Sequence, residues 1–352
     1  MITYCFPEPV HDETFSSWAT RCSLDQRSFS ITDSDIADWE RSVAYDIASK
    51  TNSLGMEFDF DALYVKDFLA STGLSNKRIR KLFAPTNDPL LSPAYRTAFC
   101  HKCILSDVIQ KRFPSWRKAW CYVARPYCQE HRCLLRYMHR HRGCDKQWDA
   151  FTKLDLGEFM PGRFIGRNRS DHGVPECAAR AHLTLRIQAW VQKVYSSAAY
   201  APCCGDYPIE NHLMRRAIDL MLGLTLTHRT RRANAGAARI AFSSFYPPTD
   251  HEGLDLLGRL RNGSPNSVPY ERMCALWLLG KIFKVFTVAE SALLYQMLHE
   301  AEFFFPLTLG ELGEMCGSSL VENESEFLAE IISKLDLGQV LDPSFVEGLI
   351  GA

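Results

Sequence analysis

Four residues of the 352-residue sequence have the types and spacing of a metal site. Cys100 and Cys103 form a Cys-x-x-Cys pair, and Cys128 and His131 form a Cys-x-x-His pair. Zn²⁺ prefers four tetrahedral nitrogen and sulfur ligands, and two ligands separated by two residues converge from one tight turn. Four protein ligands close such a site, so it would stabilise structure and leave no position open for catalysis. The sequence therefore predicts one structural Zn²⁺ ion.

Other cysteines offer alternatives to this ligand set. The residues close enough to replace a predicted ligand are His101, Cys121, Cys133 and Cys144. Cys144 could also meet Cys203 and Cys204 at a second metal, but no further Cys-x-x-Cys pair supports that site, so we expect a single ion. The remaining alternative is that the two pairs are buried or redox active and bind no metal.

The segment between the two pairs alternates aromatic and basic side chains. Its aromatic residues are Trp116, Trp120, Tyr122 and Tyr127, and its basic residues are Arg112, Arg117, Lys118 and Arg125. A small zinc module has few residues to bury, so we expect the aromatic side chains to form its core. The basic side chains are then expected to be exposed, where they can contact a nucleic acid or a ribonucleoprotein.

Charge is distributed unevenly along the chain. Residues 95–146 hold 12 Lys and Arg against 3 Asp and Glu, whereas residues 287–352 hold 1 against 12. The overall formal charge is only −1. Such segregation favours a basic surface for a polyanion and an acidic surface for another partner, and the alternative is two solvated faces.

The N-terminal residues that precede these pairs predict a lead and a helix. Pro7 and Pro9 keep the lead extended, and Asp12 or Thr14 can cap the helix that follows. The apolar face of this helix, at i, i+3, i+4 and i+7, consists of Phe15, Trp18, Ala19 and Cys22. Further helices are expected near residues 34–49 and 60–72.

Residues 59–85 predict two helices joined at Gly73-Leu74-Ser75. Gly73 suits a helix C-terminus and Ser75 a helix N-cap. The second helix has an expected apolar face of Ile79, Leu82 and Phe83. Its basic residues are Lys77, Arg78, Arg80 and Lys81. This is the outline of a helix-turn-helix whose second helix could enter a DNA major groove, although basic helix pairs are common.

The chain as a whole predicts a mainly α fold in three parts. Residues 1–94 form an N-terminal helical domain with the helix-turn-helix-like pair, and prolines mark a linker at its end. Residues 95–150 form a small zinc-ribbon or zinc-finger module, and residues 151–352 form a C-terminal helical domain. Its expected helices are 177–199, 208–227, 268–285, 287–303, 308–315 and 324–334.

Composition excludes some functional classes. No apolar run approaches the roughly 18 residues that a membrane span needs. The N-terminal segment lacks the basic and apolar regions of a signal peptide, so we expect a cytoplasmic protein. A catalytic metalloprotein would need an acid or base beside an open metal position, and Glu130 is the one candidate near the predicted ligands. The sequence therefore favours a protein that is not an enzyme.

Two motifs resemble the TniQ/TnsD family of transposon target-selection proteins, and the match covers roughly residues 5–136. The first is "FPEPVHDETFSSWATR", in which Pro7, Pro9, Glu13, Trp18 and Arg21 fall on the family signature. We expect this signature to pack the N-terminal helical domain onto the rest of the protein. The second is "FCHKCILSD", followed by "FPSWRKAWCYVARPYCQEHRCLL". Its Cys100, Cys103, Cys128 and His131 fall on the family's zinc ligands.

The resemblance implies an adaptor that marks the insertion site and recruits an AAA+ ATPase, which brings the transposase. Some relatives bind attachment-site DNA directly, and others, in CRISPR-associated transposons, form a homodimer on an RNA-guided Cascade-type complex. The acidic C-terminal region and the chain length favour the Cascade-associated type slightly. The alternative is a stand-alone, zinc-containing regulator that binds a specific DNA sequence.

Overall fold

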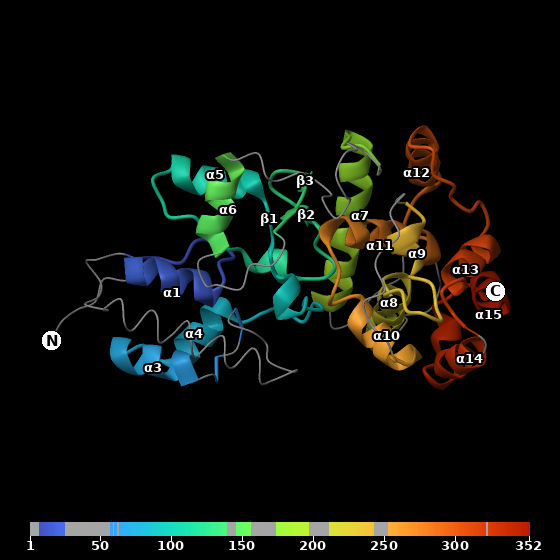
Figure 1. Ribbon diagram of the computed structural model, residues 1–352, viewed down its shortest axis with the longest axis horizontal. Helices are drawn as coiled ribbons and strands as arrows, with labels where there is room; N and C mark the ends of the chain where they lie inside the picture. The colour runs from blue at the N-terminus through green and yellow to red at the C-terminus, as the bar shows by residue number, and fades with distance from the viewer. Residues whose placement is uncertain are drawn as a thin grey trace. The chain divides into compact units, whose positions relative to one another are not determined.

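A computed structural model describes residues 7–24, 57–58, 60–61, 63–138, 146–155, 174–196, 211–242, 253–321 and 323–352. In these ranges the protein is mainly helical with a few short strands, as predicted (Figure 1). The helix expected at 34–49 and the residues Cys144, Cys203 and Cys204 lie outside them. No helix within them is long and apolar enough to cross a membrane.

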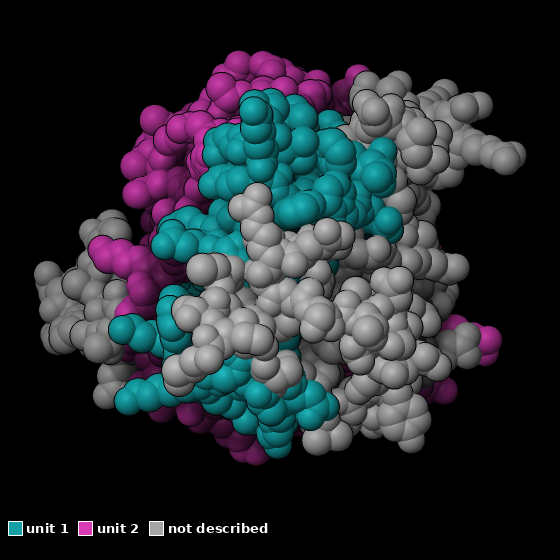
Figure 2. All heavy atoms as spheres, turned by 90° about the vertical axis from the view of Figure 1, so that its left-hand side faces the viewer, with its two compact units in different colours: residues 1–86, 91–122, 135–161 teal, residues 87–90, 123–134, 162–352 magenta. Residues whose placement is uncertain are grey.

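The chain forms two compact units, which Figure 2 distinguishes by colour. Unit 1 comprises residues 1–86, 91–122 and 135–161, and unit 2 comprises residues 87–90, 123–134 and 162–352. This grouping follows contacts in space. The predicted boundaries at residues 94 and 150 follow the sequence and remain predictions.

Unit 1 combines short helices with one two-stranded sheet. Its helices are α1 (Phe15–Leu24), α3 (Leu63–Thr72), α4 (Asn76–Phe83), α5 (His101–Ile109) and α6 (Lys146–Asp155), and its 3-10 helices are η1 (Pro93–Tyr95) and η2 (Lys118–Cys121). Strand β1 (Ala98–Phe99) pairs antiparallel with β4 (Arg136–Tyr137), with Ala98 opposite Tyr137. Helices α5 and α6 lie side by side (Figure 1).

An aromatic core holds α1, α3 and α4 together. The predicted face of α1 is buried in it, which confirms the periodicity argument. Phe15 makes edge contacts with Phe60, Phe68 and Phe83 at centroid distances of 5.6–5.9 Å. The buried members of this core are Phe15, Trp18, Ala19, Cys22, Phe60, Val65, Leu69, Ile79 and Phe83.

The predicted turn between α3 and α4 is confirmed in detail. Gly73 has φ +69°, a left-handed conformation that glycine adopts without a steric cost. Ser75 is the N-cap of α4, and its side chain accepts a hydrogen bond from the backbone N–H of Arg78. Ile79 and Phe83 are buried, but Leu82 is exposed, so its predicted place on the apolar face is wrong. Phe83 is four positions after Ile79, so the two side chains share one face of the helix, whereas Leu82 lies about 100° around the helix from Phe83.

Unit 2 contains a hairpin and most of the helices. The hairpin pairs β2 (Tyr127–Cys128) with β3 (Cys133–Leu134). The helices are α7 (Ala178–Ser196), α8 (Asn211–Thr225), α9 (Ala237–Ile240), α10 (Leu256–Gly263), α11 (Pro269–Ile282), α12 (Val288–Glu300), α13 (Leu309–Gly317), α14 (Glu324–Lys334), α15 (Pro343–Gly351) and the 3-10 helix η3 (Leu337–Gln339). The six predicted C-terminal helices are confirmed as α7, α8 and α11–α14, whereas α9, α10 and α15 were not predicted.

Aliphatic packing and close backbone contact build the core of unit 2. Helix α11 is buried along its length, and the indole N–H of its Trp277 donates to Thr184 Oγ1 at 3.0 Å. Helices α13 and α15 touch backbone to backbone, because a Cβ on Gly313 would collide with the Phe345 carbonyl oxygen. A Cβ on Gly348 would likewise collide with the Gly310 carbonyl oxygen. Glycine at these positions therefore sets the separation of the two helices.

Candidate metal centre

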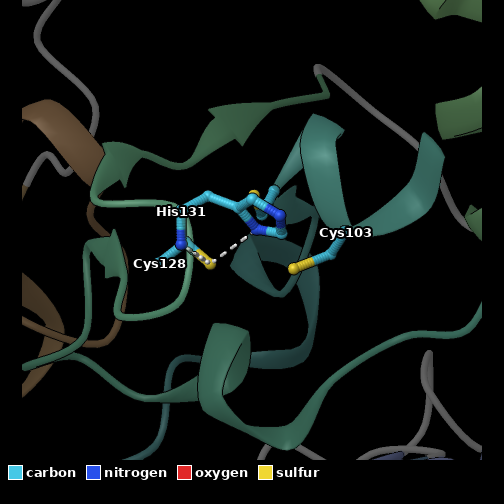
Figure 3. A group of neighbouring side chains, drawn as sticks. Cys103, Cys128 and His131 are labelled. Atoms are coloured by element: carbon cyan, nitrogen blue, oxygen red, sulfur yellow. Dashed lines mark hydrogen bonds between the residues drawn. The ribbon is translucent and has the colours of Figure 1, made fainter. Parts of the chain in front are cut away.

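The four predicted ligands come together in space. The thiol sulfurs of Cys100, Cys103 and Cys128 and a ring nitrogen of His131 all lie within 4.8 Å of one another. The three cysteines are buried and the histidine is half-buried. In Figure 3 the labelled side chains of Cys103, Cys128 and His131 point toward one another. In the described ranges this is the one group of its kind, and of the alternative ligands His101, Cys121 and Cys133 do not belong to it, whereas Cys144 lies outside those ranges.

The spacing of these atoms fits a tetrahedral ion. Zn–S bonds of about 2.3 Å and Zn–N bonds of about 2.0–2.1 Å place two ligand atoms roughly 3.5–3.8 Å apart. The sulfur of Cys128 lies 3.6 Å from His131 Nδ1, which matches the edge of such a tetrahedron. A metal ion can thus be held by this set, and a zinc ion is the expectation that the sequence supplies.

Local backbone geometry builds each ligand pair differently. Cys128 ends strand β2, and the tight turn of the β2–β3 hairpin returns the backbone N–H of His131 to 3.5 Å from the Cys128 sulfur. Arg132 closes that turn with φ 48°. Cys100 is the N-cap of α5 and Cys103 lies in its first turn, where the amide dipoles favour a negatively charged sulfur. Helix α5 therefore holds the first ligand pair, Cys100 and Cys103, and continues into the segment that follows it. The β2–β3 hairpin holds the second pair, Cys128 and His131.

Two neighbouring cysteines, Cys121 and Cys133, lie buried outside the ligand cluster. Burial raises the pKa of Cys121 to about 12, so this side chain stays neutral. No disulfide joins the cysteines in the described part of the chain, so none competes there for the predicted ligands.

The aromatic residues between the pairs are buried, as predicted. Trp116 and Trp120 pack edge to face with ring centroids 5.2 Å apart. The hydroxyl of Tyr122 accepts a hydrogen bond from the backbone N–H of Thr86 at 2.8 Å. Tyr127 is buried and bonded through its hydroxyl to Arg180 at 2.6 Å. These side chains act as structural core.

Two of the basic residues between the pairs are structural, which corrects the expectation that they are exposed. Arg125 is only 8% exposed and is ion-paired with the buried carboxylate of Asp88. Arg117 is half-buried and binds the buried carboxylate of Asp107 at 2.9 Å. Each arginine supplies the counter-charge to a buried carboxylate. Their predicted contact with nucleic acid stays a prediction.

The other predicted contact residues are more accessible. Arg112 is exposed and lies 3.4 Å from Asp107. Lys118 is half-buried and donates to the carbonyl oxygens of Leu82 at 3.2 Å and Ala84 at 3.4 Å, at the end of α4. The remaining basic residues lie on α4.

Helix α4 exposes four basic residues to solvent: Lys77, Arg78, Arg80 and Lys81. Arg80 is already ion-paired: one nitrogen of its guanidinium group donates to both carboxylate oxygens of Asp61 at 2.7 Å. In the described ranges Lys77, Arg78 and Lys81 have no ion-pair partner within 4.0 Å. These three cations therefore remain available to an external anion.

The N-terminal signature forms a polar clasp around α1. Arg21 binds Glu13 through two hydrogen bonds of 2.8 and 2.6 Å. The indole N–H of Trp18 donates to the Pro7 carbonyl at 2.8 Å. Ser17 Oγ donates to Glu13 at 2.8 Å and accepts the backbone N–H of Trp116 at 2.9 Å. The clasp thus ties the N-terminal helix to the segment between the metal ligands, as expected for a packing role.

Sequence reasoning missed a buried ionic network in unit 1. Glu57 accepts from Arg96 at 3.1 Å and is ion-paired with Lys146, and all three side chains are buried. Burial raises the pKa of Glu57, but the charges of Lys146 and Arg96 outweigh it and lower that pKa to about 2. The three residues lie up to 89 positions apart, and no local spacing signals their meeting.

Comparison with known proteins adds no identification: no family model, curated protein or solved structure matches the chain. The arrangement itself defines a small class of possibilities. In this helical protein three cysteines and one histidine converge on one point. If a metal ion binds there with tetrahedral geometry, these four side chains can occupy all four of its coordination positions.

Proposed function

We propose that this protein is a non-catalytic target-selection adaptor of a transposon. It links a target-recognition complex, either an RNA-guided Cascade-type complex or attachment-site DNA, to the AAA+ ATPase that regulates the transposase. It acts as a homodimer with one structural Zn²⁺ ion. The observation that carries the proposal is that the two segments of the TniQ/TnsD resemblance meet: Thr14 and Ser17 bond to the backbone of Trp116 at 2.8 and 2.9 Å.

The metal cluster supports an adaptor role over catalysis. A site with four protein ligands has no position for an attacking water. Glu130 is exposed to solvent in the turn between Cys128 and His131, and its carboxylate lies 4.0 Å from His131 Nε2. We assign Glu130 no catalytic part, and we assign the metal the task of fixing α5 and the β2–β3 hairpin.

Helix α4 supplies the basic side chains that we propose to contact an anionic partner. Lys77, Arg78 and Lys81 are exposed cations, and Arg112 adds a fourth from the segment after α5. Reversing the charges of Lys77, Arg78 and Lys81 to Glu should weaken binding to DNA or to a guide complex. For duplex DNA, removing one phosphate contact lowers the slope of log Kd against log[salt] by about 0.9, so the slope should fall by roughly 2–3. Lys334→Glu, an exposed cation on α14, is the matched control.

A reconstitution tests the adaptor role directly. The full-length protein is mixed with the cognate AAA+ ATPase, with and without a guide-loaded Cascade-type complex, and the mass of each assembly is measured by light scattering. We expect a dimer that joins both components. An absence of association with the ATPase, with and without guide complex or DNA, would refute the adaptor.

The second candidate is a stand-alone zinc-containing regulator that binds a specific DNA sequence. The α3–α4 pair favours it, because a capped turn presents a short basic helix. Selection of binding sites from random duplex DNA separates the two. An enriched sequence bound tightly by the protein alone supports the regulator or direct attachment-site recognition, and sequence-independent binding supports the guided adaptor.

A further inference from the structure

The loop between α12 and α13 presents two large apolar side chains to solvent. Phe304 is 76% exposed and Leu307 is 74% exposed. Most exposed hydrophobic residues on a protein surface occur singly, and two so close in sequence form a small contact surface. We refer to residues 302–307 as the acidic apolar loop.

Buried neighbours fix this loop in place. Phe305 is buried between Phe242, stacked at 5.8 Å, and Tyr295, edge-on at 5.4 Å. The Tyr295 hydroxyl donates to the carbonyl oxygen of Pro306 at 2.6 Å. Because Phe305 and Pro306 are held inside, the residues on either side of them point outward. The exposure of Phe304 and Leu307 is thus built into the fold of the loop.

Four glutamates lie close to the exposed pair in the sequence, and one of them contacts the loop directly. Glu300 and Glu302 precede Phe304, and Glu311 accepts the backbone N–H of Leu307 at 3.0 Å. Glu314 follows one helical turn later on α13, where residues three apart are neighbours.

The described residues of α12, the loop and α13 contain no Lys or Arg to offset these four carboxylates. The cation beside the loop is Lys281, which lies over the Tyr295 ring at 5.0 Å, and burial lowers its pKa. The histidine of this region, His299, is exposed near the end of α12. The loop is therefore an apolar contact with a negative rim.

We propose that the acidic apolar loop docks a cationic segment of a partner protein, with Phe304 and Leu307 receiving that segment's apolar side chains. Apolar anchors with charged surroundings supply affinity and partner selection respectively. The negative rim repels phosphate groups, so it disfavours nucleic acid and anionic lipid as occupants. This inference rests on the loop alone and is independent of the proposed function.

Labelled peptides test the charge and apolar requirements separately. The probes are a 14-residue amphipathic peptide of Lys and Leu, a peptide in which Glu replaces Lys, and one in which Ser replaces Leu, each titrated with full-length protein by fluorescence anisotropy. We expect the Lys/Leu peptide to bind at least about tenfold more tightly than either of the others. Equal binding of the Lys/Leu and Lys/Ser peptides would overturn the proposal.

Variants then locate the binding surface. The double substitution Phe304→Ser with Leu307→Ser should lower affinity for the Lys/Leu peptide about tenfold or more, since it removes both anchors. Glu302→Lys with Glu314→Lys should lower it and remove most of its salt dependence. All four side chains are exposed, so the melting temperature should not change.

Matched controls and a mass measurement distinguish a docking site from diffuse attraction and from self-association. Val288→Ser, at a residue that is 90% exposed at the start of α12, and Glu326→Lys, at an exposed residue of α14, should leave peptide binding unchanged. An equal loss in these controls would mean diffuse attraction and would overturn the docking site. A fall in the oligomeric mass of the Phe304→Ser, Leu307→Ser protein would identify a second copy of this chain as the occupant, which would also overturn it.

Discussion

Unit 1 and the contact between α13 and α15 in unit 2 are stabilised in different ways. Unit 1 buries charged groups in matched sets, such as Glu13 with Arg21 and Glu57 with Arg96 and Lys146. The contact between α13 and α15 contains glycines and aliphatic side chains in place of charges. A buried charged group is stable only when a partner of opposite charge lies within hydrogen-bond geometry. A glycine contact requires only that the two helix backbones approach closely.

The two regions are therefore sensitive to different amino-acid substitutions. Removing one member of a buried charged set leaves the others unpaired at a high cost. Adding a single carbon at a glycine contact forces two backbones apart. We expect substitutions to destabilise the two regions to different degrees.

Loss of the metal should be the most damaging change to the ligand module. Cys100→Ser or His131→Ala should remove the bound zinc and the hydrogen-exchange protection of residues 98–137, because structural zinc contributes about 10–16 kcal/mol in isolated modules. Protection of α11–α14 should persist. Elemental analysis and hydrogen exchange measure both effects, and Cys177→Ser, at an exposed cysteine, is the control. Full protection in zinc-free protein would contradict the structural role.

Glu57→Gln should be the next most damaging. It leaves Arg96 and Lys146 buried without their counter-charge, which costs about 3–5 kcal/mol of unfolding free energy at pH 7 in urea denaturation. Asp61→Asn removes a solvent-exposed ion pair to Arg80, which water and salt screen, so the unfolding free energy should change little. Equal effects of the two substitutions would contradict the importance of burial.

The same network predicts acid sensitivity. Folding lowers the pKa of Glu57 from 4.5 to about 2, so the stabilisation is fully present above pH 4.5 and is lost as the pH falls toward 2. The wild-type and Glu57→Gln proteins should therefore converge in stability below about pH 2. Unfolding free energies measured from pH 7 to pH 2 test this, and a constant difference between the proteins would exclude the linkage.

Gly348→Ala should destabilise the C-terminal helices by about 1–3 kcal/mol, since its methyl group would meet the backbone of Gly310. Gly338→Ala is the matched control, because a Cβ there has open space. Urea denaturation followed by circular dichroism measures both. A stabilising Gly348→Ala substitution would mean that α15 can move away without loss.

The smallest expected effect is the loss of a helix cap. Thr287 accepts the backbone N–H of Glu290, and Glu290 accepts the backbone N–H of Thr287, so both ends of a capping box are present at α12. Thr287→Ala should cost about 1 kcal/mol in thermal unfolding. Val288→Ala, in the same turn and exposed, should change the melting temperature little. Comparable shifts in the two proteins would argue against the cap.

The sequence predicts what depends on neighbours along the chain. The metal ligands were found because each pair occupies one turn, and the α3–α4 connection because Gly73 and Ser75 have local conformational preferences. Six C-terminal helices were found from apolar periodicity. Helix α15 also had recognisable start signals, in the N-cap Asp342 and the following Pro343.

The sequence does not predict pairings between distant charges. Helix α5 was missed because its buried face includes Asp107, and α10 because its buried face includes Arg259, which pairs with Glu324. A charged residue on the inner face interrupts the apolar pattern that reveals a helix. Arg125 was expected at the surface for the same reason, since its partner Asp88 is 37 residues away.

The clasp on α1 has a consequence for how the protein is made. Ser17 bonds to a backbone group 99 residues further along the chain. At about 5–20 residues per second, the ribosome supplies that group roughly 5–20 s after Ser17. Residues 7–24 must therefore wait through most of the synthesis of unit 1 before the clasp can close.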